Sequence, residues 1–172
     1  NNEVTFINCL WDDTMEYAVD WVGTGLAFSG TNTMQSGVDG LRIDRDTGGR
    51  SSTNTLENLY FEFNSGHDIT LKDTHVTLGP CMFQGGAGTE NKQDTLCNIL
   101  ADNSTVYAIG RPSYLDNQVE RVSLINGSKF IALYSEIVSN RMKKDDTSEY
   151  IYVPDRLKDK AVKQTINDLS TS

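Results

Sequence analysis

Leu56–Leu78 reads LENLYFEFNSGHDITLKDTHVTL, and the rest of the chain can be interpreted from this stretch. Large apolar and polar residues alternate in its first part, stop at Asn64-Ser65-Gly66, and alternate again from Ile69 to Leu78. Period-two alternation around a Gly-containing break is typical of strand, tight turn and strand. The sequence therefore predicts a mostly-β protein.

Three five-residue segments share one pattern: a β-branched residue, Thr or Ser, an apolar residue, any residue, then Asn or Asp. They are Val4–Asn8, Ile69–Asp73 and Val122–Asn126. A recurring strand that ends in Asn or Asp predicts a parallel β-helix-like coil, in which apolar side chains point inward and the Asn and Asp residues satisfy turn backbone groups. An antiparallel β-sandwich is the alternative, with Asn64-Ser65-Gly66 and Asn126-Gly127 as hairpin turns. Periodicity alone favours neither.

The chain divides by character at Pro154. Residues 1–153 form the expected β-rich domain, although the polar segments 29–37 and 141–149 are expected to be loop and exposed chain. Residues 154–172 form a C-terminal helical tail, because apolar residues recur there at helical spacing, in the order Leu157, Ala161, Val162, Ile166, Leu169. We expect its apolar stripe to pack on the sheet or on a neighbouring subunit, and to support assembly by meeting copies of itself.

Composition limits the function classes. A net charge of -9 argues against nucleic acid as a partner, because phosphate binding needs clustered Lys and Arg. The sequence contains no run of about 18 apolar residues, so no membrane span is expected. The start at Asn1-Asn2, without Met, suggests a fragment or a processed product. Cys81 and Cys97 could form a disulfide in an exported protein, but buried free thiols are the favoured interpretation.

Several segments resemble rungs of the pectin-lyase-like right-handed β-helices, a family that includes polysaccharide lyases, glycosidases and phage tailspikes. They are Val4–Cys9, Val38–Asp44 and Gly66–Val76. The resemblance implies a polysaccharide-facing surface and, for tailspikes, a parallel homotrimer. The ordered catalytic signatures of the polygalacturonase group are absent from the sequence, so that activity is not carried over.

Catalysis on a polysaccharide would need two carboxylates. The candidates chosen from the sequence are Asp44, Asp46, Glu62 and Asp68. Residues 44–49, DRDTGG, resemble the start of a calcium loop, but Gly48 and Thr55 stand at its fifth and twelfth positions, where calcium ligands are expected. Calcium is therefore a minor possibility, and no other metal or cofactor is expected.

Sugar recognition would need aromatic faces beside polar side chains. The ligand-binding candidates are Trp11, Trp21, Tyr60 and His67. We expect a glycan-recognising fragment of a trimeric spike or adhesin-like protein, at an extracellular or virion surface, with a cell-surface polysaccharide as partner. The alternatives are a capsid or spike-tip assembly module without a ligand, and a polysaccharide-cleaving enzyme that uses an Asp/Glu pair.

Overall fold

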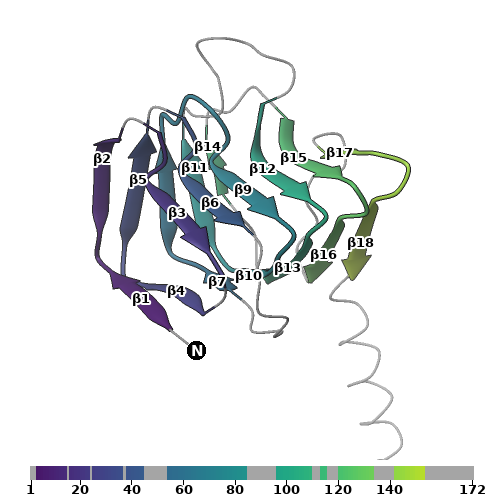
Figure 1. Ribbon diagram of the computed structural model, residues 1–172, viewed down its shortest axis with the longest axis horizontal. Helices are drawn as coiled ribbons and strands as arrows, with labels where there is room; N and C mark the ends of the chain where they lie inside the picture. Colours follow the sequence, from purple (N-terminus) through teal and green to yellow (C-terminus); the bar gives the residue numbers. More distant parts are fainter. Residues whose placement is uncertain are drawn as a thin grey trace, which may run out of the picture.

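The protein is a parallel β-solenoid built from three sheets (Figure 1). The computed structural model describes residues 3–14, 16–23, 25–36, 38–44, 54–84, 96–109, 113–115, 120–133 and 142–153. The chain runs through one strand of each sheet in turn and then starts the next coil, five times in succession. After these five coils the described strands belong to sheets A and C, and residues 134–141 lie outside the described residues.

Sheets A, B and C contain seven, five and six strands. Sheet A consists of β1 (Val4–Ile7), β4 (Leu26–Ser29), β7 (Asn54–Leu56), β10 (His75–Leu78), β13 (Thr105–Ile109), β16 (Lys129–Leu133) and β18 (Glu149–Val153). Sheet B consists of β2 (Leu10–Thr14), β5 (Asn32–Ser36), β8 (Leu59–Glu62), β11 (Cys81–Gln84) and β14 (Ser113–Leu115). Sheet C consists of β3 (Val19–Val22), β6 (Leu41–Asp44), β9 (Ile69–Lys72), β12 (Cys97–Asp102), β15 (Glu120–Ile125) and β17 (Met142–Lys144).

Every strand pairing within the described residues is parallel, which confirms the coil and makes the antiparallel sandwich wrong. Asn64-Ser65-Gly66 is therefore no hairpin turn: it lies between β8 of sheet B and β9 of sheet C. Asn126-Gly127 likewise connects β15 of sheet C to β16 of sheet A. Both are corners at which the chain changes sheet.

Two segments that were expected to be loop or exposed chain contain strands. Strand β5 lies within 29–37, and β17 lies within 141–149. Each has a single large apolar side chain, Met34 or Met142, which packs in or against the core while its neighbours are polar. One inward residue is too little for a visible period of two, so neither segment shows a strand signal in the sequence.

The core is formed by inward-facing residues that stack in columns from coil to coil. Leu41, Ile69, Ile99 and Val122 are paired along sheet C, and each is fully buried. In sheet B the rings of Phe61 and Phe83 stack at 5.2 Å between centroids, nearly parallel to one another. Each coil therefore buries its apolar residues against the coils before and after it.

The recurring five-residue pattern has a conformational basis at its last position. Asn8, Asp73 and Asn126 all adopt positive φ, at 52°, 52° and 55°. Asn and Asp tolerate the left-handed region better than other non-glycine residues, so they can end a strand and turn the chain into the next sheet. The pattern marks more than one corner, because Asn8 follows β1 of sheet A whereas the other two follow strands of sheet C.

A ladder of buried polar side chains supports the corner between sheets C and A, which we call the third corner. Its members are Asn54, Thr74, Ser104, Ser128 and Ser148, all buried. Backbone N–H groups donate to the hydroxyl one coil further on: Thr74 N to Ser104 Oγ at 3.1 Å, Ser104 N to Ser128 Oγ at 3.0 Å, and Ser128 N to Ser148 Oγ at 3.1 Å. The ladder satisfies backbone groups that a buried turn would otherwise leave unpaired.

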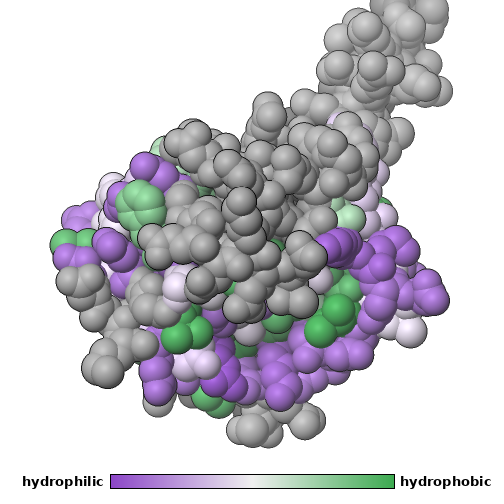
Figure 2. Space-filling model, turned by 90° about the horizontal axis from the view of Figure 1, so that it is seen from above, coloured by the Kyte–Doolittle hydropathy of each residue, from purple (hydrophilic) through white to green (hydrophobic). Residues whose placement is uncertain are grey.

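Some expectations fall outside the described residues, among them the helical tail 154–172 and Asp46. Cys9, Cys81 and Cys97 are free thiols, and the last two are buried. The described part of the chain contains no helix with the length and apolarity needed to cross a bilayer. On the face shown in Figure 2, its surface is largely hydrophilic, with apolar residues in small separate groups.

Candidate functional site

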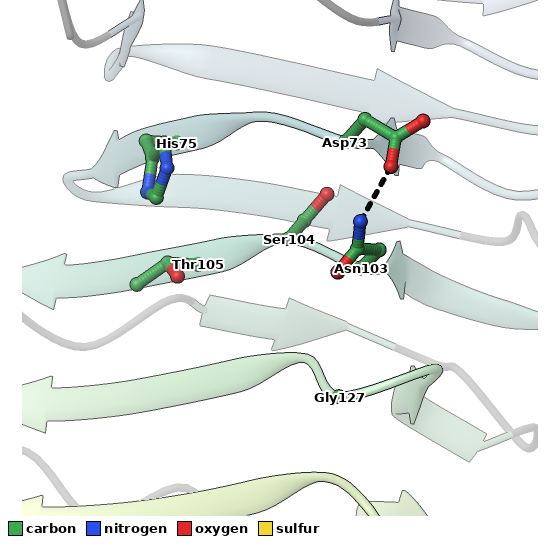
Figure 3. Close-up of a pocket in the computed structure, with 6 residues that line it drawn as sticks. All are labelled: Asp73, His75, Asn103, Ser104, Thr105 and Gly127. Carbon is green, nitrogen blue, oxygen red and sulfur yellow. Dashed lines mark hydrogen bonds between the residues drawn. The ribbon is translucent and has the colours of Figure 1, made fainter.

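A polar groove opens on the third corner, over the middle of the ladder (Figure 3). Its volume is about 400 Å³, and it is lined by Asp73, His75, Asn103, Ser104, Thr105 and Gly127. This volume is within the range of small-molecule sites. Its lining comes from three successive coils, so stacking, and not one continuous stretch of sequence, creates the site.

Asp73 and Asn103 form one end of the groove. Each is the residue that follows its sheet C strand, and both have positive φ, at 52° and 46°. Stacking of β12 on β9 brings the two residues together, and Asn103 Nδ2 donates a hydrogen bond to Asp73 Oδ1 at 2.6 Å (Figure 3). The carboxylate keeps its second oxygen, Oδ2, as an acceptor, and Asn103 keeps its side-chain carbonyl.

His75 and Thr105 form the other end. They open strands β10 and β13 and are direct neighbours across that parallel pair. The His75 side chain is exposed and that of Thr105 is half-buried, and Figure 3 shows both beside the groove. Two residues further along β13, on the same face of the strand, Tyr107 is 40% exposed, which leaves an aromatic ring available near the groove.

Ser104 forms the floor and is fixed by the ladder. Its hydroxyl donates to the carbonyl of Asp102 at 2.7 Å and accepts from Thr74 N, so both of its roles are used inside the protein. Gly127 borders the groove with φ at 78°, and a Cβ at this position would contact no atom within 4 Å. The floor is therefore rigid, and the side by Gly127 is open.

The coil after the groove carries a strongly stabilised carboxylate. Asn126 N donates to Asp145 Oδ2 at 2.6 Å, and Thr147 donates to its other oxygen through both N and Oγ1. The hydrogen bond from the Asn126 backbone, followed by those from Ser148 and Thr147, lowers the pKa of Asp145 to about 2. Asp145 thus stays charged at neutral pH, but its oxygens are occupied by the turn.

The groove offers hydrogen-bond acceptors in Asp73 and Asn103, and groups that can donate or accept in His75 and Thr105. Adjacent hydroxyl groups on a sugar ring both donate and accept hydrogen bonds, so the side chains of the groove can pair with such hydroxyl groups. Among the described residues that line the groove, Asp73 is the one carboxylate. Glycoside hydrolysis by paired carboxylates needs a second, so the described lining suits binding better than that chemistry.

The sequence-based catalytic candidates lie elsewhere. Asp44 is on the outer side of sheet C, where it pairs with Arg42 at 3.1 Å. Glu62 is on the outer side of sheet B, in register with Gln84. Asp68 is fully buried, and Asp46 lies outside the described residues, so the Asp44–Asp46 pair and the calcium loop at 44–49 stay predictions.

The aromatic ligand candidates occupy separate places. Trp11 is half-buried and packs edge-on against Phe6, with ring centroids 5.2 Å apart. Trp21 packs against the core. Tyr60 lies on the outer side of sheet B and donates to Gln84 Oε1, beside a second pocket of about 380 Å³. These three residues do not form one site, and their roles in binding stay predictions.

His67 and Asp68 lie together at the second corner, between sheets B and C. His67 Nδ1 accepts from Cys97 N at 3.1 Å and lies 3.4 Å from the Cys97 sulfur, while its own backbone N donates to Asp39 Oδ1. Asp68 accepts from the side-chain amides of Asn64 and Asn98. These contacts brace the corner, and the carboxyl of Asp68 is closed to a ligand in this conformation.

Sequence reasoning missed the groove residues, although signals for two of them were present. Asp73 ends one of the recurring segments, and Asn103 closely follows the apolar residues Ile99, Leu100 and Ala101. Their juxtaposition across 30 positions depends on the length of the insertion between the two coils. That register cannot be derived from the strand pattern alone.

Within the described ranges, no three His, Cys, Asp or Glu side chains lie close enough together to hold a metal ion. Comparison of the chain with protein-family models, with curated proteins and with solved structures gave no match. The geometry of the site is therefore the basis for assigning a function.

Proposed function

We propose that the protein is a glycan-recognising β-solenoid and that the groove at the third corner holds the sugar. The observation that carries this proposal is the groove itself, in which Asp73, His75, Asn103 and Thr105 from two adjacent coils face one space of about 400 Å³. A carboxylate oxygen would accept from one or two sugar hydroxyls, and charge-assisted bonds of this kind are roughly twice as strong as neutral ones.

The proposal includes a setting: a homotrimeric spike or adhesin-like protein at an extracellular or virion surface, with a cell-surface polysaccharide as partner. Its support is the parallel solenoid together with the resemblance of several coils to the pectin-lyase-like family. The net charge of -9 favours uncharged glycans over acidic ones, because like charges repel.

Binding to a panel of neutral and acidic polysaccharides, followed by calorimetry on each one that binds, tests the proposal. Asp73→Asn keeps the shape of the side chain and removes its charge, and Thr105→Val removes one hydroxyl. Asp73→Asn should weaken binding of the sugar by about tenfold or more, because a hydrogen bond to a charged group contributes roughly 1.5–3 kcal/mol. Thr105→Val should weaken it by less, about two- to tenfold, because a neutral hydrogen bond contributes roughly 0.5–1.5 kcal/mol. Thr55→Val on β7, on the outer side of the same sheet and away from the groove lining, is the matched control and should leave affinity unchanged.

Three results separate the alternatives. No binding across the panel would favour an assembly module without a ligand. Binding that survives both groove substitutions but is lost in Trp21→Ala or Tyr60→Ala would move the site to the aromatic candidates. Release of new reducing ends or unsaturated sugars from a bound polysaccharide would identify an enzyme and would direct attention to the carboxylates Asp44, Asp46 and Glu62.

A further inference from the structure

The outer side of sheet A changes from polar to apolar halfway along the solenoid. One outward column is formed, in order of coils, by Thr5, Ala27, Thr55, Thr77, Tyr107, Ile131 and Ile151. A second column adds Ile109, Leu133 and Val153 on the last three strands. We call the residues Tyr107, Ile109, Ile131, Leu133, Ile151 and Val153 the apolar face; they lie on β13, β16 and β18.

The apolar face is a continuous array and not a set of scattered residues. Its members alternate with inward residues on three neighbouring strands, and Tyr107, Ile109 and Ile151 are 40%, 47% and 40% exposed. Strands lie about 4.8 Å apart and alternate residues about 7 Å apart, so the array measures roughly 10 Å by 7 Å. This is close to the roughly 10 Å diameter of an α-helix. A connected group of exposed apolar side chains, unlike single scattered ones, can mark a contact surface.

We infer that segment 155–169 of the same chain covers the apolar face. The face ends at Val153, the last residue of β18, and the segment begins two residues further on. Its sequence predicts a helix with one apolar stripe, which includes Leu157, Ile166 and Leu169. A helix of about 15 residues is marginal alone in water, so the stripe needs a partner surface. The described residues offer that surface next to the point where the segment starts.

The covalent connection favours segment 155–169 of the same chain, and not that of a second copy, as the occupant of the apolar face. A short linker gives an attached segment an effective concentration in the millimolar range, well above ordinary protein concentrations. Only Pro154 separates Val153 from the segment, so the linker is a single residue. This inference is independent of glycan binding, since the groove residues are not part of the apolar face.

Hydrogen exchange on the full-length chain, together with its sedimentation mass, tests the inference. The test variant combines Ile131→Thr on β16 with Ile151→Thr on β18. Thr55 and Thr77 already occupy the same outward column on earlier strands of sheet A, so the sheet should tolerate threonine at both positions. Ile7→Thr with Leu10→Thr, which removes two exposed aliphatic side chains at the other end, is the matched control. Protection of the amides in 155–169 should fall at least tenfold in the first double variant and stay unchanged in the control, while the amides of β13 and β16 keep their protection.

Three results would overturn the inference. The first is the absence of protection in segment 155–169 of the unmodified chain. The second is protection that survives Ile131→Thr with Ile151→Thr. The third is protection that is lost on dilution in parallel with a fall in mass to 19.1 kDa, which would make a second copy the occupant.

Discussion

The side-chain amide of Asn98 lies 2.5 Å from Oδ2 of Asp68, inside the second corner, where both residues are fully buried. Asn64 Nδ2 donates to the other carboxyl oxygen at 2.8 Å. Burial raises the pKa of Asp68 to about 7, since the two amide donors only partly offset the loss of solvent, and the charge of Asp39 raises it further. The side-chain carbonyl of Asn98 has no hydrogen-bond partner among the described residues.

The Asp68 carboxyl should make stability depend on pH. Its pKa is about 7 in the folded protein against an ordinary value of 3.8, so its contribution to stability is complete below pH 4 and is lost as the pH rises through 7. The difference corresponds to roughly 4 kcal/mol. Asp68→Asn should therefore be more stable than the unmodified chain at pH 8, and the two should converge near pH 4. Urea unfolding at a series of pH values measures this, and parallel stability profiles for the two proteins would contradict it.

The third-corner ladder should be sensitive to the loss of one hydroxyl. Ser128 Oγ accepts from Ser104 N and donates to the carbonyl of Ile125 at 2.7 Å. Ser128→Ala leaves a buried N–H without a partner, which costs about 1–3 kcal/mol in unfolding free energy. Ser123→Ala on the outer side of β15 is the control and should change stability by less than about 0.5 kcal/mol. Equal losses of unfolding free energy in the two variants, measured by urea unfolding, would show that the ladder does not contribute to stability.

Gly30 and Asn8 should show coupled effects on stability. Gly30 has φ at 70°, and a Cβ there would overlap the side chain of Asn8, whose Oδ1 accepts from Thr31 N at 3.0 Å. Gly30→Ala should cost roughly 1–2 kcal/mol from backbone conformation alone, and more from the overlap. Asn8→Gly should recover the part due to overlap, so the double variant is more stable than the two separate losses would predict. If the losses of unfolding free energy in the two single variants simply add in the double variant, the corner at Gly30 accommodates the added Cβ without strain against Asn8.

The proposed spike setting predicts a trimer. Sedimentation should then give about three times the chain mass of 19.1 kDa over a wide range of protein concentrations. A mass equal to one chain would contradict the trimer, but it would leave the sugar-binding groove in place, because the residues of that groove all belong to one chain.

The strands of the coil could be predicted from the sequence because their signal is local, whereas periodicity could not decide between a parallel coil and an antiparallel sandwich. The alternation in 69–78 and the final Asn or Asp of each recurring segment depend on residues that adjoin in sequence. The structure confirms strands there and places each final Asn or Asp at a corner. Strands β5 and β17 could not be predicted, since each relies on one inward Met among polar residues. Asn32 shows the same limit: its side chain is fully buried, where Oδ1 accepts from Cys9 N of the preceding coil, and polarity alone indicated a loop.

The candidate site could not be predicted from local sequence patterns. His75 and Thr105 become neighbours only through the pairing of β10 with β13, and the strand pattern does not determine how many residues separate those two strands. Sugar-stacking logic pointed instead to Trp11 and Trp21, which the structure places against other aromatic rings and against the core. Residue type suggested a chemistry, whereas the position of the site depends on how successive coils align.

The third corner accepts connections of very different length. Two residues, Asp73 and Thr74, connect β9 to β10, whereas residues 45–53 separate β6 from β7. Yet Asn54, directly after the longer connection, returns to the ladder: Oδ1 accepts from Leu26 N at 3.0 Å, and Nδ2 donates to Thr74 Oγ1 at 3.4 Å. The scaffold is thus a natural host for grafting, in which a foreign peptide inserted between Asp44 and Asn54 would be displayed at a fixed place while the coils on either side keep their alignment.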